Sequence, residues 1–167
     1  MIYTLFSISA EVLTLNDIDN GLLSQEILSN MTRRTLDKNS TMYEDTVLAT
    51  PIGSEASKLI TQMTDIAAKK GLMMSSFWSQ VHQPLESTDL HHHGFVEYSW
   101  VYYVKVPEDA GNLIFVLDDK DHRCPQHVFT PKEGNVIIFP SYIRHRVSKN
   151  MSNDIRISVA GDFSLYK

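Results

Sequence analysis

Three consecutive histidines, His91, His92 and His93, are the residues of this chain best suited to chemistry. In an extended strand, alternate side chains point to the same face. His91 and His93 would therefore share one face, while His92 would point to the other. Neutral imidazole is a common ligand for iron, zinc and copper. The sequence therefore predicts that His91 and His93 bind a metal ion together.

A third metal ligand must come from another strand, and His145 is the best candidate. It follows an apolar segment, residues 135–139, that runs into a turn at Pro140. In a double-stranded β-helix, this arrangement brings the second strand's histidine back to face the first pair. Glu97 is a further candidate ligand, because the two-residue period places it on the face of His91 if no bulge intervenes. Three protein ligands would leave three octahedral positions for substrate and dioxygen.

Arg156 and Ser158 form a second polar pair, in the last apolar segment of the chain. Their two-residue spacing places them on one face of a strand. Arginine offers a planar fork of donors to a carboxylate, and serine adds one more donor. The pair could bind the far carboxylate of a dicarboxylic acid whose near end chelates the metal.

The elements that must position these residues differ between the two halves of the chain. Apolar residues at helical spacing predict one helix over residues 20–31 and a second from Ser54, which can cap it, to Lys70. The polar segment 32–46 is expected to be irregular. From Leu72 onward the pattern is typical of short strands separated by turns. The predicted strands are residues 73–82, 91–106, 112–117, 127–130, 135–139, 145–148 and 155–165.

Composition limits the class of protein. The chain has 167 residues with 15 basic and 20 acidic side chains, a net charge of −5, and 43% hydrophobic residues. These values are typical of a globular protein, and without a basic run nothing supports nucleic-acid binding. No apolar run is long enough for a membrane span, and one cysteine, Cys124, cannot form an internal disulfide. A reducing, cytoplasmic location is therefore expected.

Four motifs follow one another between about Trp78 and Phe163. They are His91-x-His93 with Ser99-Trp100-Val101-Tyr102-Tyr103-Val104-Lys105-Val106-Pro107, then Gly111-Asn112-Leu113-Ile114-Phe115, then Pro131-x-x-Gly134 through Phe139-Pro140-Ser141 to His145-x-Val147, and last Arg156-Ile157-Ser158. In this order they resemble a bacterial and phage family of iron(II)/2-oxoglutarate-dependent oxygenases. His93 departs from the wider superfamily, in which a carboxylate is common at this position.

The resemblance implies a mainly β fold, a double-stranded β-helix of the jelly-roll or cupin-like kind, with an N-terminal helical layer packed on one sheet. We expect a single domain over residues 1–167, with the helical part at about 1–71 and the β-helix core at about 72–167. The resemblance also implies iron(II) held by His91, His93 and His145, with 2-oxoglutarate and dioxygen as co-substrates.

In this scheme Arg156 binds the distal carboxylate of 2-oxoglutarate, Ser158 assists, and Tyr103 donates a further hydrogen bond or serves in packing. The implied activity is that of a dioxygenase, most simply a hydroxylase. No residue beyond the metal ligands is assigned a catalytic role. The primary substrate is not indicated, and a homodimer is plausible because sheet edges in such barrels often pair.

Two alternative functions remain open at this point. The spacing of His91, His93, Glu97 and His145 also resembles the two cupin motifs, which would indicate a metalloenzyme that does not use 2-oxoglutarate. A non-enzymatic protein could keep the barrel to bind a small molecule or partner. The pair at positions 156 and 158 favours the oxygenase, because cupins need no dicarboxylate site there. The remaining histidines, His82, His122 and His127, are expected on loops or strand edges without a special role.

Overall fold

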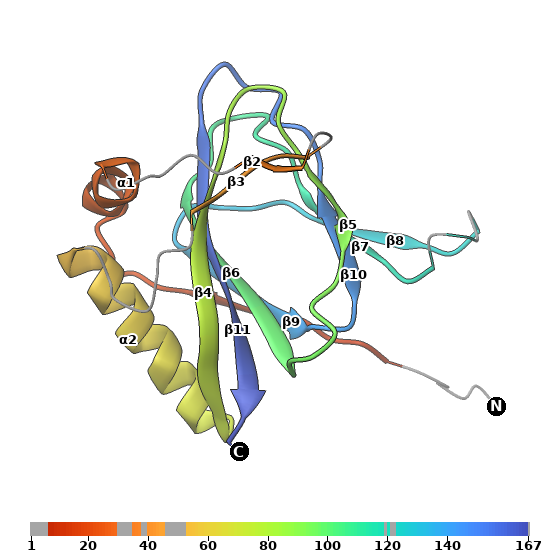
Figure 1. The fold of residues 1–167 in the computed structure, drawn as a ribbon, viewed down its shortest axis with the longest axis horizontal. Helices are drawn as coiled ribbons and strands as arrows, with labels where there is room; N and C mark the ends of the chain where they lie inside the picture. The colour runs from red at the N-terminus through yellow and green to blue at the C-terminus, as the bar shows by residue number, and fades with distance from the viewer. Residues whose placement is uncertain are drawn as a thin grey trace.

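Two antiparallel sheets face each other in the computed structural model, and two helices cover the outer face of the larger sheet (Figure 1). The structure describes residues 7–29, 35–37, 40–45, 53–118, 120 and 123–166. Its helices are α1 (Asn20–Ser29) and α2 (Ser54–Lys69), and its strands are β1 (Glu11–Thr14), β2 (Thr35–Asp37), β3 (Ser40–Asp45), β4 (Leu72–His82), β5 (Thr88–His91), β6 (Tyr98–Lys105), β7 (Leu113–Val116), β8 (Gln126–Phe129), β9 (Asn135–Pro140), β10 (Arg144–Val147) and β11 (Arg156–Leu165). Neither described helix is long and apolar enough to cross a membrane.

The order of the strands makes this the predicted double-stranded β-helix. The seven-stranded sheet has the order β1-β9-β6-β11-β4-β3-β2, and the four-stranded sheet has the order β5-β10-β7-β8. From β4 to β11 the chain passes repeatedly from one sheet to the other, and only β7 and β8 follow one another within the same sheet. Side chains on the two inner faces therefore meet inside the barrel.

The larger sheet has an apolar outer face that packs against the helices. On α2 the buried apolar residues are Ala56, Leu59, Met63 and Ala67, the spacing of a single helical stripe. They join a core that includes Leu23 of α1 and the outward residues of the central strands. In β6 these outward residues alternate with Val101 and Tyr103, which join a second apolar cluster between the sheets.

Helix α2 begins differently from the sequence prediction. Ser54 is its first residue and Gly53 is the N-cap, with no side-chain capping bond of its own. The carboxylate of Glu26, on α1, instead accepts hydrogen bonds from the backbone N–H groups of Glu55 and Ala56 at 3.1 and 2.9 Å. An anion at a helix N-terminus satisfies unpaired donors and the helix dipole. A contact distant in sequence therefore replaces the local cap.

The N-terminal part is less helical than predicted. β1 pairs with β9, and β3 pairs with β4, so strands that precede residue 72 extend both sides of the larger sheet. Segment 32–46, predicted to be irregular, contains β2 and β3. The predicted long strand 91–106 is also wrong. It is broken by the turn at 92–97, because β5 belongs to one sheet and β6 to the other.

Replacing Leu59 with alanine tests the packing of α2 on the sheet. Leu59 is fully buried, so Leu59→Ala should lower the free energy of unfolding by about 2–5 kcal/mol through lost burial and the cavity left behind. Leu22→Ala is the matched control, because Leu22 on α1 is 40% exposed and should cost under about 1 kcal/mol. Urea titration followed by circular dichroism measures both, and equal losses would contradict this packing.

Candidate metal centre

His91 and His145 are direct neighbours on adjacent strands. His91 ends β5, His145 lies in β10, and the two residues pair across the antiparallel ladder of the smaller sheet. Side chains of a directly opposed pair stand on the same face. Their ring centroids are 4.3 Å apart. Strand pairing alone therefore brings together two imidazoles that are far apart in sequence.

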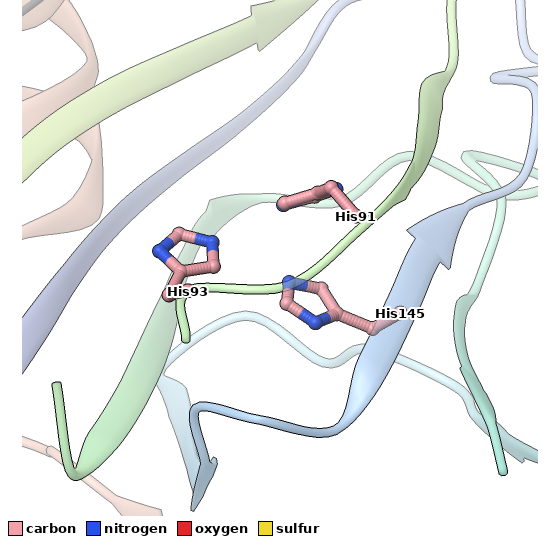
Figure 2. A group of neighbouring side chains, drawn as sticks. All are labelled: His91, His93 and His145. Atoms are coloured by element: carbon pink, nitrogen blue, oxygen red, sulfur yellow. The ribbon is translucent and has the colours of Figure 1, made fainter. Parts of the chain in front are cut away.

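His93 joins this pair from the link between the two sheets. The backbone N–H of His93 donates to the carbonyl of Ser141 at 2.9 Å, which fixes the link against the turn before β10. The His93 ring lies 5.1 Å from the His91 ring and 5.4 Å from the His145 ring. One potential ligand atom from each of the three residues lies within 4.8 Å of the other two (Figure 2). The structure thus brings together the three histidines that the sequence singled out.

Hydrogen bonds to backbone carbonyls orient the rings of His91 and His145 so that the second nitrogen of each is free. Nδ1 of His91 lies 2.8 Å from the carbonyl of Asp89, and Nδ1 of His145 lies 3.0 Å from the carbonyl of Ile143. A carbonyl only accepts, so each Nδ1 must carry the proton. Each Nε2 then keeps a lone pair. This is the tautomer that a metal ligand requires.

Burial favours the neutral form of the His91 and His145 rings. Desolvation, with a smaller contribution from the neighbouring His91 and His93, lowers the pKa of His145 to about 3. Desolvation also lowers the pKa of His91, and the hydrogen bond to Asp89 opposes this effect. Neutral imidazoles at physiological pH are ready to bind a cation without losing a proton.

A narrow cavity between the sheets connects the histidines with Arg156. Its lining includes His91, His93 and His145 at one end and Arg156 with Ser158 elsewhere. Arg156 is 2% exposed, and its guanidinium donates to the carbonyl of Ala110 at 3.4 Å. Among the residues that the structure describes, no carboxylate forms an ion pair with it. Burial lowers its pKa to about 10, so it stays charged at neutral pH.

The strand register explains which polar groups share this cavity. Ser158 in β11 pairs with Gln80 of β4 on one side and Tyr103 of β6 on the other, and all three line the cavity. The hydroxyl of Ser158 and the Nε of Arg156 are buried without a hydrogen-bond partner. Burial raises the pKa of the Tyr103 hydroxyl, so it remains a potential donor. Unpaired buried donors are costly and indicate a place for an acceptor.

His82 has a more specific position than the sequence suggested. It ends β4, is 1% exposed, and pairs with Arg156 in the sheet register. Nη2 of Arg156 lies 3.3 Å from Nδ1 of His82. On the other side of the same ring, Nε2 of His82 lies 2.8 Å from the hydroxyl of Thr88. A guanidinium only donates, so Nδ1 accepts and Nε2–H donates to Thr88. A neutral His82 therefore orients Arg156, whereas His127 is exposed and His122 lies outside the described residues.

Glu97 does not approach the three histidines in this structure. Its carboxylate accepts a hydrogen bond from the backbone N–H of Leu165 at 2.9 Å. The turn at 92–97 interrupts the strand, so the two-residue parity counted from His91 does not reach it. Ser99 and Tyr103, which continue the two-residue period beyond Glu97, do line the cavity.

Asp162 is the carboxylate that the sequence reasoning missed. Its two oxygens lie 3.1 and 3.3 Å from Nδ1 of His93. The signal was present, because the two-residue period that relates Arg156 to Ser158 continues through Ala160 to Asp162.

The family of the chain follows from its sequence. Residues 76–162 match the model of a family described as "Putative 2OG-Fe(II) oxygenase", which is more than half of the chain. The chain belongs to the 2OG-Fe(II) oxygenase family. This oxygenase is an oxidoreductase whose co-substrate is 2-oxoglutarate and whose metal is iron(II). No protein of curated function matches its sequence.

Solved structures of the same fold agree with this assignment. The oxygenase is similar to the α-ketoglutarate-dependent epimerase SnoN from nogalamycin biosynthesis, with a TM-score of 0.72 at 14% identity over 93% of this chain and 76% of that chain. It is also similar to the α-ketoglutarate-dependent carbocyclase SnoK of the same biosynthesis, with a TM-score of 0.69 at 12% identity over 93% of this chain and 79% of that chain. A Pseudomonas putida prolyl-4-hydroxylase has a TM-score of 0.67 at 17% identity over 96% of this chain and 95% of that chain. At such identities these similarities establish the fold.

The buried His82 makes the stability of the oxygenase depend on pH. Desolvation lowers its pKa from 6.5 to about 3 in the folded protein. As pH falls below about 6.5, His82 binds a proton in the unfolded chain but stays neutral in the folded protein. The free energy of unfolding therefore decreases until about pH 3. Between about pH 7.5 and about pH 5, wild-type protein should lose about 2 kcal/mol more than His82→Gln.

Urea unfolding of metal-free protein at the two pH values measures this difference. His91 and His145 titrate in both proteins and set the remaining slope. His127→Gln is the control, because this exposed side chain should leave the wild-type slope unchanged. If the free energy of unfolding changed equally with pH in wild type and His82→Gln, a buried neutral His82 would be contradicted.

Proposed function

We propose that this oxygenase is a hydroxylase that binds iron(II) through Nε2 of His91, His93 and His145. Arg156 and Ser158 bind the distal carboxylate of 2-oxoglutarate, and Tyr103 adds a hydrogen bond. The observation that carries the proposal is a single cavity that contains three histidines able to bind one metal ion and a buried guanidinium without a carboxylate partner among the described residues. The primary substrate is an organic molecule with an accessible C–H bond.

The residues present fit both the metal and the co-substrate. Three neutral imidazole nitrogens on one side leave open positions of the kind used by non-haem iron oxygenases. The Nε of Arg156 and the hydroxyl of Ser158 lack hydrogen-bond partners. A carboxylate between them would accept both hydrogen bonds and neutralise the buried cation. The donor set thus supports a dicarboxylic acid whose other end reaches the metal.

When bound, iron(II) and 2-oxoglutarate supply an oxidation that needs no redox group from the protein. In the balanced reaction, a C–H bond, dioxygen and 2-oxoglutarate give a C–OH group, succinate and carbon dioxide. One oxygen atom of dioxygen enters the product and the other enters succinate. The protein contributes the positions of the reactants and a site from which water is excluded.

The side chains of the cavity have separate tasks in this scheme. Arg156 fixes the co-substrate, and His82 fixes Arg156 through its Nδ1. Val101 and Phe139, with other apolar residues, line the cavity and limit the water that reaches it. The backbone carbonyls of Asp89 and Ile143 hold two of the imidazoles in the required tautomer. Each task is performed before any substrate arrives.

Hydroxylation is the simplest outcome of this chemistry, and it needs its own test. The structurally similar proteins include a carbocyclase, an epimerase and a prolyl hydroxylase, so the fold alone does not select the outcome. Iron-loaded protein should be incubated with fractionated cell extract under isotopically heavy dioxygen. A product that gains one heavy oxygen atom is expected, whereas a product without it would exclude hydroxylation.

Arg156 separates this proposal from a cupin enzyme that does not use 2-oxoglutarate. Arg156→Ala should weaken 2-oxoglutarate binding by at least about 30-fold, because removing one partner of a buried charge pair costs about 2–5 kcal/mol. Arg146→Ala is the matched control, since Arg146 is exposed on β10. Equilibrium dialysis of radiolabelled 2-oxoglutarate against anaerobic iron-loaded protein measures both.

Binding of 2-oxoglutarate that is unchanged in Arg156→Ala would rule out this role of Arg156. Failure of wild-type protein to bind 2-oxoglutarate would favour a cupin enzyme that does not use this co-substrate. Arg156→Lys keeps the charge without the planar fork and should give an intermediate affinity. It also provides a folded variant if the alanine variant is unstable.

The three histidines are tested by metal binding without any substrate. His145→Ala removes one of three ligands and should reduce the iron bound after anaerobic loading and desalting to well below one ion per chain. The control His127→Ala changes an exposed histidine and should bind as much iron as wild type. Elemental analysis gives the stoichiometry. Full iron binding by His145→Ala would place the metal elsewhere.

We also propose a reducing, cytoplasmic location and a single domain over residues 1–167. The single cysteine, Cys124, supports the location, since disulfides are rare where thiols stay reduced. The helices and the larger sheet share one apolar core, which supports the domain assignment.

A further inference from the structure

Asp162 lies in the middle of a row of three polar side chains on the inner face of the larger sheet. In the strand register it pairs with Ser76 of β4 on one side and with Ser99 of β6 on the other. An irregularity in the β4 pairing follows directly after Asp162. Bulges of this kind re-aim side chains and are frequent next to active sites. The register therefore directs the carboxylate toward the end of the cavity where the histidines converge.

The carboxylate of Asp162 acts only as an acceptor in its surroundings. The hydroxyl of Ser99 donates to Oδ1 at 2.8 Å, and the hydroxyl of Ser76 donates to Oδ2 at 3.0 Å. Nδ1 of His93 lies 3.1 Å from Oδ1 and 3.3 Å from Oδ2. The side chain is 9% exposed. With both oxygens engaged, Asp162 is placed to hold a metal ligand and not to bind the metal itself.

His93 needs such a partner more than the other two histidines do. His91 and His145 are in paired strands and donate to backbone carbonyls, whereas His93 lies in the turn between the sheets. The ring of Trp78 stacks on His93 with centroids 5.5 Å apart and planes at 10°. Stacking fixes the plane of the ring but does not decide which nitrogen carries the proton. The contact with Asp162 decides that.

The charge of Asp162 also matters for a metal held by three neutral ligands. Three imidazoles leave both positive charges of a divalent ion uncompensated by the protein. A carboxylate hydrogen-bonded to the far nitrogen of a ligating imidazole strengthens that ligand, and removing such a partner typically lowers metal affinity 10- to 100-fold. Asp162 is the carboxylate in contact with the described histidine cluster.

We propose that Asp162 is the positioning residue of the metal centre, holding the Nδ1–H of His93 so that Nε2 faces His91 and His145. This role rests on the proposed function, because it requires the three histidines to bind the metal. Asp162 restores through one imidazole the negative charge that a directly ligating carboxylate would have supplied. Ser76 and Ser99 hold the carboxylate in place.

The test compares Asp162→Asn with wild-type protein and uses Co²⁺ as the probe metal. Asparagine keeps the size of the side chain and one acceptor oxygen but removes the charge. The Co²⁺ dissociation constant, measured by calorimetry, should rise roughly 10- to 100-fold in Asp162→Asn. Asp154→Asn is the matched control, because it removes the charge of an exposed carboxylate that pairs with Lys105 and not with a histidine, and it should change the affinity by less than about threefold.

A second measurement reports the tautomer of His93 directly, first in wild-type protein and then in a variant. In the nitrogen NMR spectrum of metal-free wild-type protein near neutral pH, the His93 ring should carry its proton on Nδ1. Asp162→Ala, which removes the acceptor, should shift the population toward the Nε2–H form. A merely structural role for Asp162 would change stability without moving this equilibrium.

The outcomes separate this inference from the function on which it rests. If wild-type protein binds no Co²⁺, both the metal centre and the role of Asp162 are overturned. If wild type binds Co²⁺ and Asp162→Asn binds it equally well, only the role of Asp162 is overturned. An NMR spectrum that shows the Nε2–H tautomer of His93 in wild-type protein would overturn the role of Asp162 as well, even if no variant of Asp162 folds.

Discussion

The antiparallel register of β11 between β4 and β6 is the constraint on which the rest of the structure depends. Alternate side chains of these three strands point to opposite faces, so one face packs under the helices and the other lines the cavity. The same register places Arg156 beside His82, Ser158 between Gln80 and Tyr103, and Asp162 between two serines. A slip of one residue would send all of these polar groups into the apolar core.

The smaller sheet completes the site, and neither sheet could form it alone. Two of the histidines belong to the ladder between β5 and β10, while the guanidinium and the Asp162 carboxylate belong to the larger sheet. His93 lies in the link that joins the sheets, and its backbone is fixed by Ser141. Closing the β-helix therefore assembles the histidines and also brings them to the cavity that contains Arg156. The site forms only when the fold is complete.

Burial has opposite consequences for the two kinds of polar residue in this cavity. It removes the charge from the imidazoles of His91 and His145, which keeps their Nε2 lone pairs available to a cation. It leaves Arg156 charged, because the pKa of a guanidinium starts so high that lowering it to about 10 does not reach neutrality. The cavity thus presents neutral ligands at one end and, at the other, a cation that no carboxylate of the described residues compensates. That asymmetry suits a ligand with a metal-chelating end and an anionic end.

Periodicity in the sequence predicted most of the strands from β4 onward, although it missed β5 and joined residues 91–106 into one strand. It also predicted that Arg156 and Ser158 share a face, because pleating has a fixed period of two. The position of His145 after the turn at Pro140 indicated it as the partner of the first histidine pair. Periodicity could not place Glu97, since the parity argument assumes an unbroken strand and the chain turns at 92–97 to enter the other sheet. Nor could it find the cap that Glu26 provides to α2, or the contact of Asp162 with His93. Those interactions join segments 29 and 69 residues apart, and only the packing of complete sheets and helices decides which distant side chains meet.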